Sequence, residues 1–482
     1  MNKQLILSRS SRRQFIKYGA LAAGGAALTG PYLLRGQNLN SKLNIAQIGC
    51  AGKGGSDAQC NYSAGETLAA LCDVNANALN GLAHQLPGAK TYKDYRELFD
   101  KEKSIDAVDI ATPDHMHAVI AATAIKLGKH VYCQKPLTHD VFEARTLREL
   151  ARKYKVATQM GNQGSASDSL RRAVEIVQAG VIGPVHEAYV WTNRPIWPQG
   201  MDRPPGADPV PSQLEWDLWL GTAPERPFKS FWPTPQNMME QQRRQVPVYQ
   251  PFVWRGWLDF GTGALGDMAC HTVNWPFRSL NLGYPTEIEA TSSGINSEMY
   301  PTSSRIRFEF PARESMPPVT LHWSDGGNKP AADVTADVEA MLGQLSNSGC
   351  IMVGEKGTIF SPDDGDQDLR AFIKLKGDRE MVGVQNHDAV KAIPQKIPRN
   401  SHTGAPDERQ HLEWLQACKD GKFDVPYSNF DIAAYLTEII LLGCVALRVG
   451  KKLEWDGPAM TAKNAPEAAN VVKRKYRKGW DL

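Results

Sequence analysis

The chain has 482 residues, of which 42% are hydrophobic and 22% are charged. This length and composition predict a globular protein of two or three domains with cores of ordinary size. The formal net charge of +3 argues against nucleic acid or another polyanion as a partner. The one dense basic run, at residues 473–478, lies in no aromatic-rich binding motif, and we interpret it as the solvated face of a terminal helix.

An export signal is predicted at the N-terminus, over residues 1–38. The run Ser11–Lys17, SRRQFIK, matches the twin-arginine motif, and a mildly apolar stretch rich in Ala and Gly follows over residues 18–34. That stretch is too short and too weakly apolar to span a bilayer, which takes about 20 apolar residues. We therefore expect export to the periplasm by the twin-arginine pathway, with no membrane span in the mature protein.

The cysteines and the acidic runs predict neither a disulfide framework nor a metal site. The eight cysteines form no CxxC motif. Proteins on the twin-arginine route fold in the reducing cytoplasm, so we expect mostly free thiols although the periplasm permits disulfides. The run at residues 363–368 resembles a calcium loop but lacks the glutamate at the twelfth position, so we interpret it as a solvated acidic turn.

Residues 42–163 alternate short apolar runs with helical stretches, which predicts a Rossmann domain built on a doubly wound parallel sheet. The helices expected between the strands include 76–85, 117–127 and 141–154. The apolar runs that we expect to be strands are Leu43–Ile48, Thr67–Cys72, Ala107–Ala111, His130–Cys133 and Val156–Met160.

Residues 164–482 have a different pattern, which predicts an α+β domain with an open, mainly antiparallel sheet for substrate binding and oligomerisation. A long loop region rich in Pro and Trp, 195–251, follows the first strand; such loops commonly carry function. Turns rather than helices separate the later apolar runs, which favours antiparallel pairing. The strands expected here are Val185–Thr192, Thr286–Thr291, Ser304–Phe310, Val319–Trp323 and Cys350–Val353, and the helices are Asp168–Ala179, Asp407–Asp420 and Asp431–Val449.

A glycine-rich turn after the first strand predicts a dinucleotide site. Gly49, Ala51 and Gly54 occupy the three positions of the G-x-G-x-x-G pattern, with Gly52 and Lys53 between them. The first glycine allows a tight turn, the second position must be small so that backbone can approach the pyrophosphate, and the third allows close helix–strand packing. The following helix N-terminus favours negative charge, so it faces the phosphates.

The second predicted strand ends in an acidic residue, Asp73. A carboxylate at this position accepts hydrogen bonds from the adenosine ribose hydroxyls and repels a 2′-phosphate. The expected cofactor is therefore NAD in preference to NADP.

Two further motifs follow predicted strands, at the edge of the sheet where ligands bind in open α/β folds. Thr112, Pro113 and His117 come after the fourth strand, and Gln134 and Lys135 come after the fifth. We expect these residues to contact the cofactor. The lysine would also stabilise the alkoxide that develops when an alcohol is oxidised.

A third motif pairs Asp267 with His271. Residues four apart lie on one face of a helix, so the carboxylate can orient or charge-tune the imidazole. His271 could then accept a hydroxyl proton as hydride leaves. A buried histidine of the core is the competing interpretation.

At these motifs the sequence resembles the glucose–fructose oxidoreductase / inositol dehydrogenase (Gfo/Idh/MocA) family of oxidoreductases, over most of residues 42–480. The resemblance implies a Rossmann domain followed by a domain with an open, largely antiparallel sheet, and an active site between that sheet and the nicotinamide. The family's catalytic lysine falls on Lys135, its aspartate on Asp267 and its histidine on His271. Members commonly have Glu-Lys-Pro where this chain has Gln134 before the lysine, so the environment of the lysine is expected to differ.

The resemblance extends to a branch of the family that is exported by sugar-degrading bacteria, over residues 254–271 and 428–448. Aromatic composition also points to a sugar, because apolar sugar faces pack on rings. We expect most of these rings to lie in the core, and Trp191, Trp254, Asn193 and Arg194 to contact substrate. Eight of the twelve tryptophans lie in one region: Trp191, Trp197, Trp216, Trp219, Trp232, Trp254, Trp257 and Trp275.

The leading hypothesis is an NAD-dependent oxidoreductase that converts a secondary hydroxyl of a sugar or glycoside to a ketone. Lys135 would hold the reacting oxygen, His271 would be the base with Asp267 behind it, and Gln163 would line the nicotinamide pocket. Because exported NAD is not easily replaced, we expect it to be tightly bound, in a homo-oligomer. One alternative is an NAD-dependent glycosidase that oxidises, eliminates and reduces; another is a non-catalytic binding or scaffolding protein on the same fold.

Overall fold

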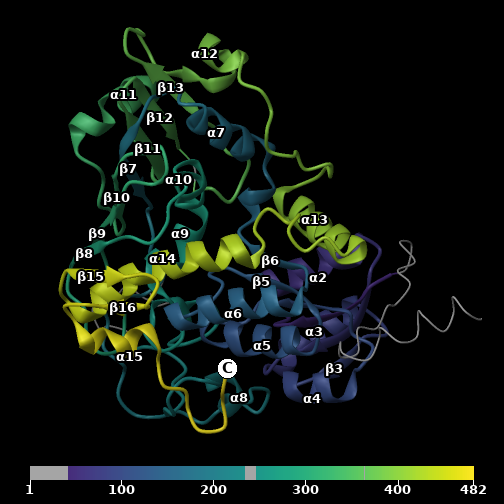
Figure 1. Ribbon diagram of the computed structural model, residues 1–482. Coiled ribbons are helices and arrows are strands. Elements are labelled where there is room, and N and C mark those ends of the chain that lie inside the picture. The colour runs from purple at the N-terminus through teal and green to yellow at the C-terminus, as the bar shows by residue number, and fades with distance from the viewer. Residues whose placement is uncertain (1–41, 234–245, 363) are drawn as a thin grey trace, which may run out of the picture. The chain divides into compact units, whose positions relative to one another are not determined.

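The computed structural model describes residues 42–233, 246–362 and 364–482. The predicted signal over residues 1–38 lies outside them. Residues 42–482 form a single compact unit that contains both sheets (Figure 1). All eight cysteines are free thiols, as expected, and all but Cys60 are buried.

The first sheet has six parallel strands in the order β3-β2-β1-β4-β5-β6, which confirms the predicted doubly wound fold. The strands match the predicted apolar runs to within about two residues, except β3, whose short polar sequence gave no signal. The strands are β1 (Asn44–Ile48), β2 (Thr67–Cys72), β3 (Lys90–Tyr92), β4 (Ala107–Ile110), β5 (His130–Gln134) and β6 (Thr158–Gly161). The helices of this half are α2 (Lys53–Ser63), α3 (Ala76–Gln85), α4 (Tyr95–Lys101), α5 (Asp114–Lys126) and α6 (Val141–Tyr154).

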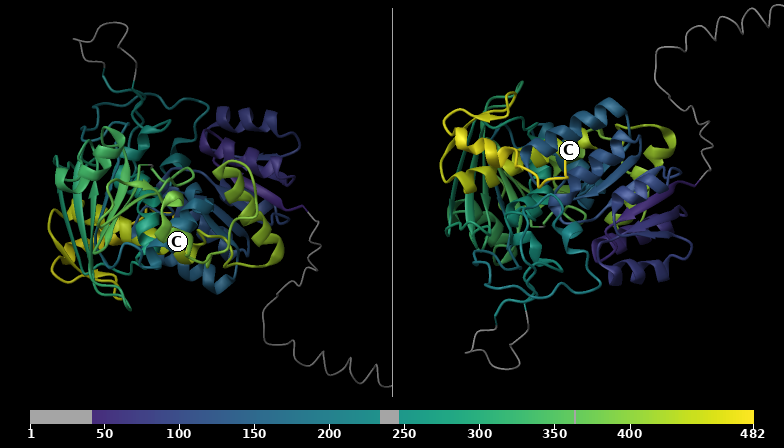
Figure 2. Two further views of the ribbon diagram at one scale, coloured as in Figure 1. Left: turned by 90° about the horizontal axis from the view of Figure 1, so that it is seen from above. Right: turned by 90° about the horizontal axis from the view of Figure 1, so that it is seen from below.

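The second sheet has ten strands in the order β14-β13-β12-β11-β7-β10-β9-β8-β15-β16. Every pair is antiparallel except β7 with β10, so the expectation of a mainly antiparallel sheet is confirmed. Figure 2 shows this sheet beside the Rossmann half of the molecule. Its strands are β7 (Val185–Trp191), β8 (Glu287–Ser292), β9 (Ser304–Phe310), β10 (Val319–Ser324), β11 (Gly349–Gly354), β12 (Gly357–Ser361), β13 (Phe372–Leu375), β14 (Val382–Gly383), β15 (Leu453–Asp456) and β16 (Thr461–Ala462).

The other helical elements are mostly short and connect or cover the sheets. The α-helices are α7 (Asp168–Gln178), α8 (Trp216–Leu220), α9 (Gly263–Thr272), α10 (Asn274–Ser279), α11 (Ala332–Leu342), α12 (Asp388–Lys391), α13 (Pro406–Asp420), α14 (Phe430–Val449) and α15 (Ala469–Val472). The 3₁₀ turns are η1 (Gln163–Ala166), η3 (Val253–Gly256), η4 (Val384–Asn386) and η5 (Pro466–Ala468).

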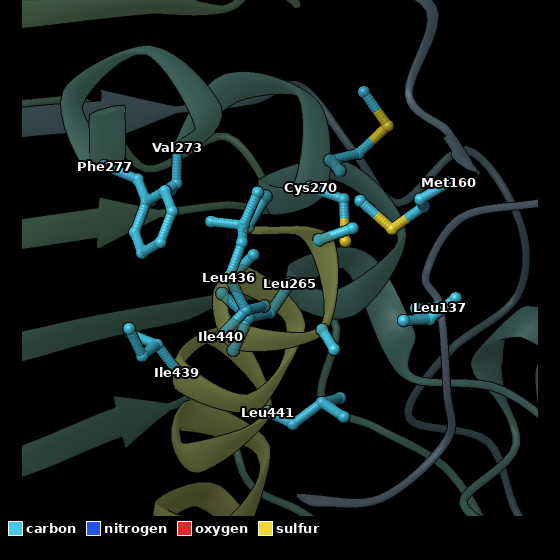
Figure 3. Close-up of a cluster of buried hydrophobic side chains, with 14 of the residues drawn as sticks. Leu137, Met160, Leu265, Cys270, Val273, Phe277, Leu436, Ile439, Ile440 and Leu441 are labelled. Carbon is cyan, nitrogen blue, oxygen red and sulfur yellow. The ribbon is translucent and has the colours of Figure 1, made fainter. Parts of the chain in front are cut away.

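Helix α14 joins the two halves. It packs against α6 and β6 on one side and against α9 and β8 on the other. Figure 3 shows Leu436 and Ile440 of this helix against Leu265 of α9. A side chain at Gly443 would meet Leu265, so glycine permits the close approach. By length and composition α14 is apolar enough to cross a membrane, but 78% of its most apolar window is buried inside the protein.

Helix α13 returns from the second half of the chain to the Rossmann sheet, where it contacts α2 and β6. Trp414, Leu415 and Cys418 share a buried apolar cluster with Ile45 and Leu71 of the parallel sheet. Burying one leucine-sized side chain stabilises a fold by about 2 kcal/mol. The nucleotide-binding half is therefore completed by residues far along the chain.

The loop region 195–251 builds its own core. The buried rings of Trp219 and Tyr249 cluster with those of Trp257 and Phe260, which follow the region in the chain, and Trp216 and Trp254 are half-buried at the edge of the cluster. Trp191 was predicted to contact substrate, but it is fully buried in a separate cluster, where it stacks on Phe360, so that prediction is wrong. Most of these rings are structural, as expected.

The basic run at residues 473–478 is solvated only in part. Lys473, Lys475 and Lys478 are exposed, as expected. The side chain of Arg474, by contrast, is only 11% exposed: its Nη2 donates to Glu143 at 3.0 Å, to Thr222 at 2.8 Å and to the carbonyl of His115 at 2.9 Å. The C-terminal segment is thereby fixed to the start of α6. The helix expected there is confined to α15, which ends before the run.

Candidate active site

The turn between β1 and α2 has the geometry that a dinucleotide needs. Gly49 has φ +91°, and a Cβ on it would lie 2.5 Å from the carbonyl oxygen of Ala111. A Cβ on Gly54 would overlap the carbonyl of Gly49, so both positions require glycine. Gly52 precedes α2 with φ +53°, has open space beside it and provides no side-chain cap. The uncapped helix N-terminus leaves amide donors for phosphate oxygens.

Asp73 lies at the end of β2, where a ribose acceptor was predicted. Its Oδ2 accepts from the amide of Cys50 at 2.7 Å and its Oδ1 from the amide of Asn75 at 2.8 Å. Burial raises the pKa of this carboxyl group, while the two amides lower it. Because a carboxylate has about four acceptor sites, the bonds fix its position and leave sites for ribose hydroxyls.

Lys135 follows β5 and is held by Asp267 of α9. Its Nζ lies 3.0 Å from Oδ1 of Asp267 and donates to the backbone carbonyl of the same residue at 2.9 Å. Arg255 of η3 donates from Nε to the same Oδ1, also at 3.0 Å. The Asp267 side chain is 7% exposed. Burial raises the pKa of this carboxyl group, but the charges of Lys135 and Arg255 outweigh burial and lower it to about 2.

The partners of Asp267 distinguish between its two predicted roles, to orient the imidazole of His271 or to tune its charge. The carboxylate is engaged by two cations, Lys135 and Arg255. It acts on the imidazole through its charge, which favours the protonated ring. Sequence reasoning missed Arg255, because its spacing in the chain does not indicate a contact with α9.

His271 lies one turn after Asp267 on α9 and is buried, and its Nδ1 has no hydrogen-bond partner among the residues that the structure describes. Burial, and then the positive charge of Lys135, lower its pKa to about 3. The imidazole is therefore neutral at neutral pH, which is the state that can accept a proton. The charges of Lys135 and Asp267 both act on this ring, the first lowering and the second raising its pKa.

The side chains of His117 and Gln134, which were predicted to contact the cofactor, bind groups of the protein. Nδ1 of His117 lies 2.8 Å from the carbonyl of Pro136, and Nε2 lies 2.8 Å from the carbonyl of Thr112. The buried ring thus joins the loops after β4 and β5, which carry Pro113 and Lys135. Gln134 is also buried and donates from Nε2 to Oδ2 of Asp57 at 2.7 Å.

Asp114 is a second buried acid that the sequence did not single out. It begins α5, directly after Pro113, and its Oδ2 accepts from the hydroxyl of Thr262 at 2.8 Å. Burial, and then the charge of Asp267, raise its pKa to about 8. At neutral pH this group is protonated, so the negative charge of the site resides on Asp267.

The residues predicted to contact nicotinamide or substrate come from three loops around α9. Gln163 begins η1, and the preceding Asn162 donates to the carbonyl of Cys270 at 3.0 Å, which places this turn next to His271. Asn193 is exposed, whereas Arg194 is half-buried. Trp254 is half-buried, with the guanidinium of its neighbour Arg255 4.4 Å from its ring centroid.

The acidic run was expected to be a solvated turn, and residues 366–368 are indeed exposed, whereas Asp364 and Gly365 pack against the site. Asp364, 20% exposed, lies 3.5 Å from Nη1 of Arg194. A Cβ on Gly365 would lie 2.7 Å from the carbonyl oxygen of His271, and a Cβ on Gly164 of η1 would overlap the carbonyl of Gly365. Sequence reasoning missed this turn because its polarity is equally typical of an exposed loop.

Comparison with known proteins agrees with this geometry. Residues 43–162 match the family model described as "Oxidoreductase family, NAD-binding Rossmann fold", GFO_IDH_MocA. Residues 43–162 are therefore an NAD-binding Rossmann domain.

Among curated relatives, myo-inositol 2-dehydrogenase of Thermotoga maritima is 28% identical over 131 residues, 27% of this chain and 39% of that protein. Levoglucosan dehydrogenase of Pseudarthrobacter phenanthrenivorans is 30% identical over 115 residues, 24% of this chain and 29% of that protein. The chain thus matches well under two thirds of the length of these relatives.

Solved structures extend the likeness to both halves of the fold. A levoglucosan dehydrogenase in complex with NADH and levoglucosan has a TM-score of 0.55 at 15% identity, over 86% of this chain and 99% of that chain. An inositol dehydrogenase homolog from Azotobacter vinelandii, complexed with NADH and myo-inositol, has a TM-score of 0.56 at 15% identity, over 86% and 98%. At this identity the likeness establishes the shared fold.

Proposed function

We propose that the protein is an NAD-dependent dehydrogenase that oxidises a secondary hydroxyl of a sugar or glycoside to a ketone. The observation that carries the proposal is the cluster of Lys135, Asp267 and His271 at the strand ends of an NAD-binding sheet. The names of the relatives, inositol and levoglucosan dehydrogenases, support a polyhydroxylated substrate.

Lys135 is placed to hold the reacting oxygen. An ammonium group has three N–H donors, and two point to the carboxylate and the backbone carbonyl of Asp267. The third is left for the substrate hydroxyl, and the positive charge stabilises the alkoxide that forms as the O–H bond breaks. Asp267 therefore fixes the direction of that donor while Arg255 fixes Asp267.

His271 is the candidate base. It takes the hydroxyl proton as the C–H electron pair leaves carbon and the C=O bond forms, so the alcohol loses one proton and one hydride. Bound NAD⁺ supplies the hydride acceptor. The negative charge of Asp267 favours the imidazolium that this step creates.

The residues around this cluster support a sugar as substrate. The Arg194–Asp364 pair beside η1 and α9 offers both donors and acceptors, which suit vicinal hydroxyl groups. The half-buried ring of Trp254 offers an apolar surface for C–H faces. Asn193, exposed on the same loop, adds an amide.

The proposal includes export and retention of the cofactor. The twin-arginine motif at Ser11–Lys17 supports passage of the folded protein to the periplasm. The free, mostly buried thiols are consistent with folding in a reducing compartment. A cofactor loaded before export would then be recycled in place, and assembly into a homo-oligomer stays a prediction.

The test uses the full-length protein purified without added nucleotide. We expect it to contain NAD and to yield a keto-sugar from at least one member of a panel of sugars and glycosides. Lys135→Met should abolish the product, whereas Lys126→Met, a change at an exposed lysine of α5, should not. Equal product from both variants would refute the assignment of Lys135. Aglycone release from a nitrophenyl glycoside without net oxidation would select the glycosidase mechanism.

A further inference from the structure

A buried ionic network lies behind the dinucleotide turn and is not explained by the proposed chemistry. Asp57 of α2, Asp109 of β4 and His411 of α13 are fully buried, and one ligand-type atom from each lies within 4.8 Å of the others. Burying several charges is costly unless they are paired. Helix α2, strand β4 and helix α13, which are distant in sequence, therefore meet at a buried cluster of ionisable side chains.

The network begins at the first turn of α2, the helix that faces the phosphates. Nζ of Lys53 lies 2.7 Å from Oδ1 of Asp57, one turn further along the same helix. The same Nζ donates at 2.7 Å to Oδ1 of Asp407, near the start of α13. Burial lowers the pKa of Lys53, but the charges of Asp57 and Asp407 outweigh it and raise the pKa.

The network continues through α13 to the sheet. His411 lies one turn after Asp407 and its Nδ1 is 2.8 Å from the Asp407 carbonyl. Its Nε2 lies 3.3 Å from Oδ2 of Asp109, and its ring stacks on Tyr132 with centroids 4.2 Å apart. Although burial lowers the pKa of His411, Asp109 and Asp57 raise it above its usual value.

Two basic side chains, Lys53 and His411, thus lie against the two fully buried carboxylates, and Lys53 is shared with the more exposed Asp407. Lys53 and His411 supply the charge that a metal ion would otherwise bring, so the spacing of Asp57 and Asp109 does not require one. Asp57 also accepts from Gln134, the residue before Lys135. The network therefore ties the phosphate-facing turn, the catalytic strand end and α13 into one set of hydrogen bonds.

We propose that the Lys53–Asp407 contact is a clasp by which α13 holds the first turn of α2 in place, and that this clasp slows the release of bound NAD. The inference rests on the proposed function only in naming NAD as the ligand. Asp407 and His411 are positioning residues, because they act on the turn through Lys53 and Asp57. An ordered helix N-terminus keeps its amides directed at the phosphates, whereas a frayed one loses these bonds.

A second ion pair between α13 and the Rossmann half provides a matched control. Lys419, in the last turn of α13, pairs with the buried Glu66 that precedes β2. Lys419→Gln breaks an α13 contact of the same kind at the far end of the helix. Any general loosening of α13 should therefore follow from both changes, whereas a clasp at the phosphate turn should respond to Asp407 alone.

The experiment loads the purified protein with radiolabelled NAD⁺ and chases it with excess unlabelled NAD⁺. Asp407→Asn should release the label about threefold to tenfold faster than the wild type, the range expected for a partly exposed charge-assisted bond. Asp407→Glu should restore slow release, and Lys419→Gln should match the wild type. An unchanged rate in Asp407→Asn, or equal acceleration in Lys419→Gln, would overturn the proposal. Slower release would also do so, because it would mean that Asp407 acts by repelling phosphate.

Hydrogen exchange of NAD-free protein gives a readout that does not depend on binding. Backbone amides in the first turn of α2, residues 53–57, should exchange faster in Asp407→Asn than in wild type or Lys419→Gln. Equal exchange in all three proteins would contradict the clasp whatever the nucleotide does. Failure of the wild type to bind labelled NAD⁺ at all would instead refute the proposed function.

Discussion

The Asp267 carboxylate contributes both to the stability of the fold and to the proposed activity, and the variant Asp267→Asn measures the two contributions. Its pKa of about 2, against a usual value of 3.8, corresponds to about 2.5 kcal/mol of stabilisation at neutral pH, at about 1.4 kcal/mol per pKa unit. Because the pKa is lower in the folded state, this stabilisation is fully present above about pH 4 and is lost as pH falls through about 2. Asparagine also leaves Lys135 and Arg255 without their counter-charge.

We therefore expect Asp267→Asn to lower the free energy of unfolding at pH 7 by about 3–5 kcal/mol. It should also lower kcat for sugar oxidation by about a hundredfold, since the donor of Lys135 is no longer directed. Urea unfolding and steady-state kinetics measure the two effects. The matched control is Asp431→Asn, whose pair with Arg152 is half exposed and should cost about 1 kcal/mol or less.

The reasoning would be refuted if Asp267→Asn were as stable and as active as the Asp431→Asn control. It would also be refuted if the stability difference between wild type and Asp267→Asn stayed constant from pH 5 to pH 2. A titrating carboxylate requires that difference to shrink over this range.

Three further predictions follow from buried groups. Burial and the charge of Asp267 raise the pKa of Asp114 to about 8, so the free energy of unfolding of the wild type falls as pH rises from about 4 to 8. Asp114→Asn should therefore raise the free energy of unfolding by up to about 4 kcal/mol at pH 7. A difference between the urea midpoints of variant and wild type that is the same at pH 5 and pH 8 would contradict this. Arg474→Met leaves the buried Asp140 and Glu143 without their cation. It should lower the free energy of unfolding by about 3–5 kcal/mol. A melting temperature unchanged from the wild type would show that Arg474 does not anchor the C-terminal segment. Trp191→Ala should cost about 3–5 kcal/mol and leave KM for the sugar unchanged; a raised KM in a protein of wild-type stability would return this ring to the substrate site.

Much of the fold was predictable because its signals are local. The apolar runs that became β1 and β2, and the turn from Gly49 to Gly54, depend only on neighbouring residues. The alternation of strands and helices indicated the parallel sheet, and turns indicated the antiparallel one. The short strand β3 was not predicted, because its three polar residues at the edge of the sheet resemble the sequence of a loop.

The site was only partly predictable, since its contacts join distant segments. The sequence placed Lys135, Asp267 and His271 in one site, but the periodicity that put Asp267 and His271 on one helix face could not show that the carboxylate points to Lys135 and Arg255. Gln134 appeared to be a lost carboxylate beside the lysine, whereas its amide binds the buried carboxylate of Asp57 on another element.

The return of α13 to the Rossmann sheet was not predictable for the same reason. The sequence indicated the helix itself, but not that Asp407 and His411 would meet α2 and β4. An amphipathic helix shows which face is apolar without showing what covers it. Pairing of charges across more than 300 residues leaves no local pattern.

The most direct test of the central claim is the redox state of the nucleotide released on denaturation, in wild type and Lys135→Met, after incubation with the sugar panel. In a single turnover with one sugar and no second substrate to reoxidise the cofactor, the wild type should release NADH in amounts that match the keto-sugar formed, while Lys135→Met should release NAD⁺ only, at an undiminished total. Reduction at the wild-type rate in Lys135→Met, or a wild-type protein that holds and reduces no NAD, would contradict the account.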